Sequence, residues 1–168
     1  HKVVKSGINA VILLFNMMFR GLNKINLDAK GRIAIPARYK DSLGNLSSNL
    51  LICTIDQDHC LLLYPLKFWK SIEQKIMKLP TLNSTSRRLQ RLMVGHAAEL
   101  EMDSNGRILI PKELREFAKL TKKAMLVGQG NKFEIWNYDD WNIGREKWLT
   151  TQEADLSELP TELETLSL

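Results

Sequence analysis

The chain carries one nine-residue pattern twice, and this repeat constrains its fold more than any other feature. Asp-x-x-Gly-Arg-Ile-x-Ile-Pro occurs at 28–36 and again at 103–111. Over fourteen aligned positions around it, six residues are identical at an offset of 75. A second pair of similar segments, 61–69 and 133–141, aligns at an offset of 72. Two matched blocks in the same order indicate a duplicated unit of roughly 70 residues.

Each copy of the motif is typical of a β-hairpin followed by a helix. Asp begins the turn, because its carboxylate can accept hydrogen bonds from backbone N–H groups further along. Gly can adopt a positive φ, alternating Ile predicts one buried strand face, and Pro ends the strand and can open a helix. The expected strands are 24–27, 32–35, 50–55 and 60–64, then 98–102, 107–110, 124–127 and 132–136. The expected helices are 37–43 and 66–79, then 112–120 and 139–149, which makes the chain an α+β protein of two tandem β-rich repeats with short helices.

These elements divide the chain into five segments. The first repeat is expected at 18–80 and the second at 98–149, with a linking loop and an Arg-rich helix between them at 81–97. Residues 1–17 contain an apolar run that is too short to span a bilayer as a helix, and we expect an upstream extension or a cloning remnant there. Residues 150–168 form an acidic tail without Lys or Arg.

The charge of the chain is unevenly distributed. The formal net charge is +5, but the acidic tail holds five acids and no cation, so residues 1–149 carry a net charge of +10. A body this basic suits a polyanionic partner, and nucleic acid is the leading candidate. Many basic proteins do not bind DNA, so charge alone does not decide between these interpretations.

An enzyme needs a constellation of reactive groups, and the sequence shows none. It has no Gly-rich phosphate loop, no nucleophile elbow and no pair of metal-ligand motifs, so we predict no catalytic residue, no metal and no cofactor. Cys53 and Cys60 sit among apolar residues and are interpreted as core cysteines of a reducing compartment. Asp28 and Asp103 could be imagined as a catalytic carboxylate pair, but their place at the start of a turn explains them more simply.

The cations near the motif are the better lead. Alternation along the strand sends the isoleucines inward and Arg32 outward, and Arg107 holds the matching place in the second unit. A hairpin that projects an Arg can reach phosphates or guanine edges. The alternative is that Arg32 pairs with Asp28 and serves the turn alone. Both can hold, because an Asp can orient an Arg that still contacts DNA.

From Met18 onward the sequence resembles the MraZ family. The resemblance covers about residues 18–148 and rests on the stretches 18–21, 26–32, 36–39, 87–91, 95–97, 103–111 and 128–136. It implies an AbrB-like fold in which the two halves form a pseudo-twofold pair with swapped hairpins. It also implies a cytoplasmic, nucleoid-associated transcription factor of the division and cell-wall gene cluster, assembled as a ring-shaped homo-oligomer.

Members of this family bind short direct repeats in the promoter ahead of their own gene, so the resemblance implies double-stranded DNA as the partner and no membrane. The expected DNA-binding residues are Asp28, Lys30, Arg32, Arg38, Asp103, Asn105 and Arg107. Asn105 stands where the first unit has Lys30, which argues against equal DNA contact by the two hairpins. The alternative function is a non-enzymatic protein-interaction scaffold with incidental DNA affinity.

Overall fold

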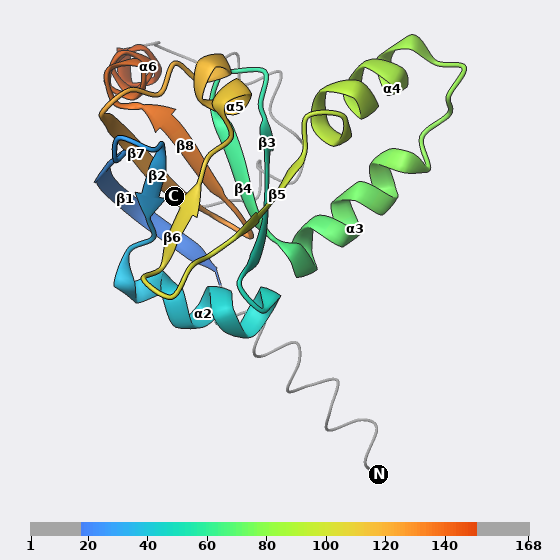
Figure 1. Cartoon of the computed structure of the whole chain (residues 1–168). Coiled ribbons are helices and arrows are strands. Elements are labelled where there is room, and N and C mark those ends of the chain that lie inside the picture. The colour runs from blue at the N-terminus through green and yellow to red at the C-terminus, as the bar shows by residue number, and fades with distance from the viewer. Residues whose placement is uncertain (1–17, 151–168) are drawn as a thin grey trace, which may run out of the picture. The chain divides into compact units, whose positions relative to one another are not determined.

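The computed structural model describes residues 18–150, which alternate short strands with helices (Figure 1). The strands are β1 (Phe19–Asn26), β2 (Arg32–Ala34), β3 (Leu50–Ile55), β4 (Leu61–Pro65), β5 (Ala98–Glu101), β6 (Arg107–Leu109), β7 (Lys123–Gly130) and β8 (Phe133–Asn137). The helices are α2 (Ala37–Ser47), α3 (Leu66–Met77), α4 (Ser84–Leu89), the π-helix η1 (Gln90–Val94), α5 (Lys112–Phe117) and α6 (Tyr138–Thr150).

The chain divides into two compact units. The first ends at Tyr138, and the second begins at Asp139 and includes nearly all of α6. Within α6 the rings of Trp141 and Trp148 meet edge to face, with centroids 5.6 Å apart. No helix of the described part of the chain is long and apolar enough to cross a membrane. The expected extension at 1–17 and the tail beyond Thr150 lie outside the described residues.

The large antiparallel sheet is built from both repeats, and each repeat lends its first strand to the other. Its six strands have the order β1-β7-β8-β4-β3-β5. β1 of the first repeat pairs with β7 of the second, and β5 of the second pairs with β3 of the first. Exchanging the two repeats only reverses this order. The sheet therefore has the pseudo-twofold symmetry and the swapped strands of an AbrB-like fold, as the family resemblance implies.

The hydrophobic core lies where the two repeats meet. At the centre of the sheet, β4 and β8 place Leu61 opposite Ile135 and Leu63 opposite Phe133, all fully buried. The ring of Phe133 also lies 4.3 Å from that of Phe19, measured between centroids. Burying one such side chain stabilises the fold by about 1.5–3 kcal/mol. The core therefore stabilises the two repeats as one body.

The two helices that follow the motif differ in length more than the sequence predicts. Both begin after a proline whose φ of −54° suits the start of a helix. α2 runs to Ser47, beyond the expected end at 43, because Leu46 is buried in the core. α5 ends at Phe117, short of the expected 120, since Lys119 adopts a left-handed φ of 52°. The last turn of α2 therefore has no counterpart in the second repeat.

β1 and β7 are longer than predicted, because they pair along their whole length. β1 begins at Phe19 rather than at 24. Gly128, just past the expected strand end at 127, lies inside β7 opposite Gly21. A Cβ on Gly128 would lie 2.5 Å from the backbone N of Arg20, so only glycine allows the strands to approach this closely.

The linking segment is helical as predicted, but it has two parts. Asn83 caps α4 by accepting a hydrogen bond from the first-turn backbone N–H of Ser86 (3.1 Å), and the chain then continues into η1. Thr54 of β3 donates a hydrogen bond to the carbonyl of Met93 (2.6 Å) and ties η1 to the sheet. Two leucines of this segment, Leu89 and Leu92, stay exposed.

Candidate nucleic-acid interface

The first hairpin turn is organised by the carboxylate of Asp28. Its Oδ1 accepts hydrogen bonds from the backbone N–H groups of Lys30 (2.9 Å) and Arg32 (3.0 Å), and its Oδ2 accepts one from Nε of Arg32 (2.6 Å). Gly31 completes the turn with a φ of 84°. The backbone N–H of Arg32, helped by its guanidinium, lowers the pKa of Asp28 from 3.8 to about 2. Asp28 therefore both shapes the turn and orients Arg32.

The second hairpin repeats this arrangement. Oδ1 of Asp103 accepts from the backbone N–H groups of Asn105 and Arg107, both at 2.9 Å, and its Oδ2 lies 2.9 Å from Nε of Arg107. Gly106 has a φ of 71°. The same cause, led by the backbone N–H of Arg107, lowers the pKa of Asp103. The turn-forming role expected for both aspartates is therefore present in the structure.

A two-stranded ribbon of β2 and β6 joins the two turns (Figure 1). Ile33 lies opposite Ile108, and both are fully buried. Because side chains alternate, Arg32 and Arg107 share the outer face of this ribbon, as diagonal neighbours about 7–8 Å apart. Their side chains are 28% and 34% exposed. The ribbon thus presents one Arg from each repeat on a single outward face.

The described part of the chain holds each of these two guanidinium groups at its Nε. Within residues 18–150, Nε of Arg32 and of Arg107 binds its aspartate, and no protein group accepts a hydrogen bond from the terminal nitrogens. A guanidinium held in this way keeps its terminal NH2 groups for a bidentate partner such as a phosphate or a guanine edge. The pairing with Asp thus leaves the arginine able to bind an anion.

Two further cations reach the turns from the opposite repeat, and sequence reasoning missed both. Nζ of Lys40 in α2 donates a hydrogen bond to the carbonyl of Asn105 in the second turn (3.1 Å). The guanidinium of Arg115 in α5 lies against Gly31 of the first turn, in the space that a Cβ would need. Lys40 and Arg115 match at the offset of 75. The repeat therefore contained this signal, but only the intertwined fold shows which turn each cation reaches.

The remaining expected residues fall into two groups. Lys30 and Asn105 lie in the turns, where their backbone N–H groups bond to aspartate oxygens. Arg38 points instead at β1, where it donates to Oδ1 of Asn23 (3.0 Å), and its guanidinium lies 4.7 Å from the ring centroid of Tyr39. The structure thus gathers six of the seven expected residues in the two turns and gives Arg38 a different set of contacts.

The thiols and acids of the described residues form no metal centre. Within 18–150, no group of three or more His, Cys, Asp or Glu side chains could hold a metal ion. Cys53 and Cys60 are buried free thiols. Burial raises the pKa of Cys53 to about 12 and also raises that of Cys60. Both sulfurs therefore stay protonated at neutral pH, which makes them poor nucleophiles and poor ligands.

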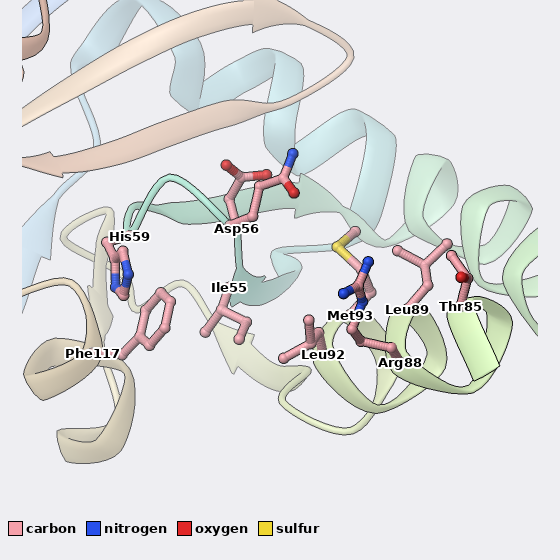
Figure 2. A pocket seen from close by; sticks show the side chains of 10 residues that line it. Ile55, Asp56, His59, Thr85, Arg88, Leu89, Leu92, Met93 and Phe117 are labelled. Atoms are coloured by element: carbon pink, nitrogen blue, oxygen red, sulfur yellow. The ribbon is translucent and has the colours of Figure 1, made fainter.

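An apolar groove of 520 Å³ forms a surface apart from the two turns. Figure 2 shows Leu89, Leu92 and Met93 along one side and Phe117 on the other. His59 stacks on Phe117, with 5.0 Å between ring centroids. None of the expected DNA-binding residues lines this groove.

The swapped strands and the Asp-oriented arginines place this chain among the AbrB-like proteins. A family model described as "MraZ protein, putative antitoxin-like" matches residues 18–92 and 93–163. Proteins named "Transcriptional regulator MraZ" from Halorhodospira halophila, Coxiella burnetii and Legionella pneumophila are 51%, 52% and 49% identical to it over 152 residues. Each comparison covers 90% of this chain and 100% of the relative. The chain belongs to the MraZ family of transcriptional regulators, which is not a family of enzymes.

Proposed function

We propose that this protein is a sequence-specific regulator that reads double-stranded DNA with the β2–β6 ribbon. The observation that carries the proposal is the display of Arg32 and Arg107 on one outward face. The major groove of DNA is about 12 Å wide and admits a two-stranded β-ribbon. From there, the terminal nitrogens of each Arg can bond to guanine O6 and N7 or to flanking phosphates.

The composition of the ribbon face supports base reading over phosphate contact alone. Leu109 lies on this face opposite Arg32 and is 53% exposed. Against the methyl group of a thymine, this side chain would gain an apolar contact that water does not offer. In this proposal Asp28 and Asp103 orient the arginines, and Lys30 and Asn105 face the DNA from the turns. Arg38 would act on the flank, since Asn23 engages its guanidinium.

We propose further that copies of the chain assemble into a ring, at the nucleoid in the cytoplasm, on direct repeats in the promoter of their own division and cell-wall gene cluster. Each copy brings two hairpins from one pseudo-twofold body, which supports binding to repeated sites. Linking weak contacts in this way raises affinity by roughly 10²–10⁴ without any new contact. Phosphate contacts would make the affinity fall with salt.

The test of the ribbon compares Arg32→Ala with Lys70→Ala, a matched variant that removes one exposed cation from α3. Binding to a promoter duplex with direct repeats is measured by gel shift at one salt concentration, with circular dichroism as the check on folding. Arg32→Ala should lower the affinity about tenfold or more, and Lys70→Ala should change it little. A folded Arg32→Ala protein that binds as tightly as wild type would falsify the role of the ribbon.

The ring is tested separately by light scattering of the chain from Met18 onward, with and without promoter DNA. A species of several copies is the expected result, and its mass should rise by that of the duplex when DNA is added. A strict monomer under both conditions would overturn the ring and the argument from linked contacts.

The groove beside Leu89 and Leu92 favours a second candidate, a protein-interaction scaffold with incidental DNA affinity. An apolar groove with exposed leucines is typical of a protein-binding surface. Binding that ignores DNA sequence and disappears steeply with salt would favour this candidate. Discrimination of the promoter from a scrambled duplex at the same salt would exclude it.

A further inference from the structure

The first turn has a cationic hollow beside it. This hollow, of 360 Å³, is lined by three cations of the second repeat, Lys112, Arg115 and Lys119, and by one acid, Glu116. Arg115 belongs both to the hollow and to the first turn, because its guanidinium lies against Gly31. The surface at this end of the molecule therefore combines the first turn, from the first repeat, with cations of the second repeat.

Little in the described residues competes for these cations. Nε of Arg115 is buried and has no hydrogen-bond partner there, so only the terminal nitrogens of its guanidinium can meet an external anion. Neither Arg115 nor Lys119 forms an ion pair within 18–150. Lys112 lies 3.7 Å from Glu116, but their side chains are 75% and 66% exposed. Exposed pairs of this kind contribute at most about 1 kcal/mol. The three cations are therefore available to an external anion.

The matching end of the molecule lacks this concentration of charge. At the offset of 75, Ala37 and Gly44 of α2 match Lys112, which begins α5, and Lys119, which follows the end of α5. The cleft beside the second turn is lined by a single cation, Lys40, together with two acids. The two turns thus share their geometry but differ strongly in the field that an approaching polyanion would meet.

We propose that Lys112, Arg115 and Lys119 form a binding site for the phosphates of a nucleic-acid backbone. The site extends the first hairpin, where Lys30 is exposed and Arg32 is partly exposed, and makes it the stronger of the two DNA contacts. It is completed by both repeats, since the turn comes from the first and the three cations from the second. The inference rests on the proposed function, because the phosphates are those of the DNA that the ribbon holds.

The experiment measures binding of a short random-sequence duplex by fluorescence anisotropy, from about 50 to 200 mM salt. The double variant Lys112→Gln/Lys119→Gln removes two charges from the hollow and keeps the side chains long. Its matched control is Lys67→Gln/Lys70→Gln, which removes two exposed charges from α3. Thermal unfolding of each protein checks that the fold is intact.

Log K falls as log salt rises, and each lost phosphate contact makes this slope shallower by about 0.9. The hollow variant should therefore lose 1–2 units of slope and bind roughly tenfold more weakly at ~0.1 M salt. The control should lose less than half a unit. Equal losses in the two variants, or none in the hollow variant, would overturn the site while leaving the proposed function standing. A wild-type protein that binds no duplex at all would overturn both.

A converse variant adds two cations to the other end of the molecule. Ala37→Lys/Gly44→Lys places two cations on α2 at the positions that match Lys112 and Lys119. Ala37 is exposed, and a Cβ on Gly44 would meet only Oδ1 of Asn49 at an ordinary 3.5 Å. We expect the slope to steepen by 1–2 units. An unchanged slope would contradict the phosphate contacts that we assign to the positions of Lys112 and Lys119.

A last arm separates DNA from free phosphate as the ligand. Inorganic phosphate is titrated into the preformed complex at constant ionic strength. We expect phosphate to displace the duplex only weakly, and to the same extent from wild type and from the hollow variant. Displacement of the duplex from wild type by phosphate at concentrations comparable to the duplex would mean that the hollow serves a free phosphate, and the proposal would be wrong.

Discussion

The two hairpins of this protein share their backbone but not their surroundings. In both, an Asp accepts two backbone hydrogen bonds of 2.9–3.0 Å and binds Nε of the Arg four residues later. Around the first turn, α5 and the residues just after it contribute three cations, whereas α2 contributes only Lys40 to the second. The backbone geometry of the turn is the same in both hairpins, because each repeat requires this turn to form its ribbon strand. The cations are not needed to form the turn, so their number can differ between the two ends. The two ends therefore differ in how strongly they attract a polyanion.

The largest expected effect is on stability, and it tests the buried face of the ribbon that the two hairpins share. Ile33→Ala and Ile108→Ala each remove a fully buried side chain from the ribbon, and each should cost about 2–5 kcal/mol of unfolding free energy. Urea unfolding measures this cost, and Leu109→Ala, at an exposed position of the same ribbon, serves as the control with a cost below about 1 kcal/mol. One isoleucine variant that unfolds at the wild-type midpoint would show that the two halves do not share one core.

The next effect is on DNA affinity, and it tests the different numbers of cations around the two turns. Arg32→Ala should weaken DNA binding by about 1–3 kcal/mol, and Arg107→Ala should weaken it less, because its turn has fewer cations around it. Anisotropy titrations of both variants with one promoter duplex make the comparison. Equal losses would mean that the helices beside the turns do not influence the hairpins.

The turn glycines should give smaller, paired effects. Gly31 and Gly106 have φ values of 84° and 71°, so alanine at either position should cost about 1–2 kcal/mol. The added methyl would also displace Arg115 from the first turn and Lys40 from the second. Stability measured by urea should fall equally, while DNA affinity should fall more for Gly31→Ala. The reverse order of affinities would contradict the unequal ends.

The smallest effect concerns pH. The pKa of Asp28 is lowered to about 2 from 3.8, so its contribution to stability is complete above about pH 4 and is lost as the pH falls toward 2. NMR titration of the carboxyl group reports this pKa. In Arg32→Ala we expect only a partial rise, because the backbone N–H, the largest cause, remains. A return to 3.8 would show instead that the guanidinium holds the carboxylate.

Much of the local structure was predictable, and two of the misses share one cause. The hairpins, the prolines that open α2 and α5, and the outward Arg32 all follow from residue types a few positions apart. The length of α2 was not predictable, because it depends on the burial of Leu46. Gly128 lay beyond the expected end of its strand, but β1 approaches it too closely for any side chain. Both of these misses depended on a contact with a segment distant in the chain, whereas the early end of α5 follows from the local backbone at Lys119.

The same division holds for the candidate interface. The sequence by itself determined the two turns, because Asp, Gly, alternating Ile and Pro act on one another within nine residues. Only the tertiary structure decided that Lys40 reaches a carbonyl 65 positions away and that Arg115 reaches the first turn. Strand exchange about the pseudo-twofold axis interleaves the two repeats, and no local pattern of residues encodes which turn a helix will meet.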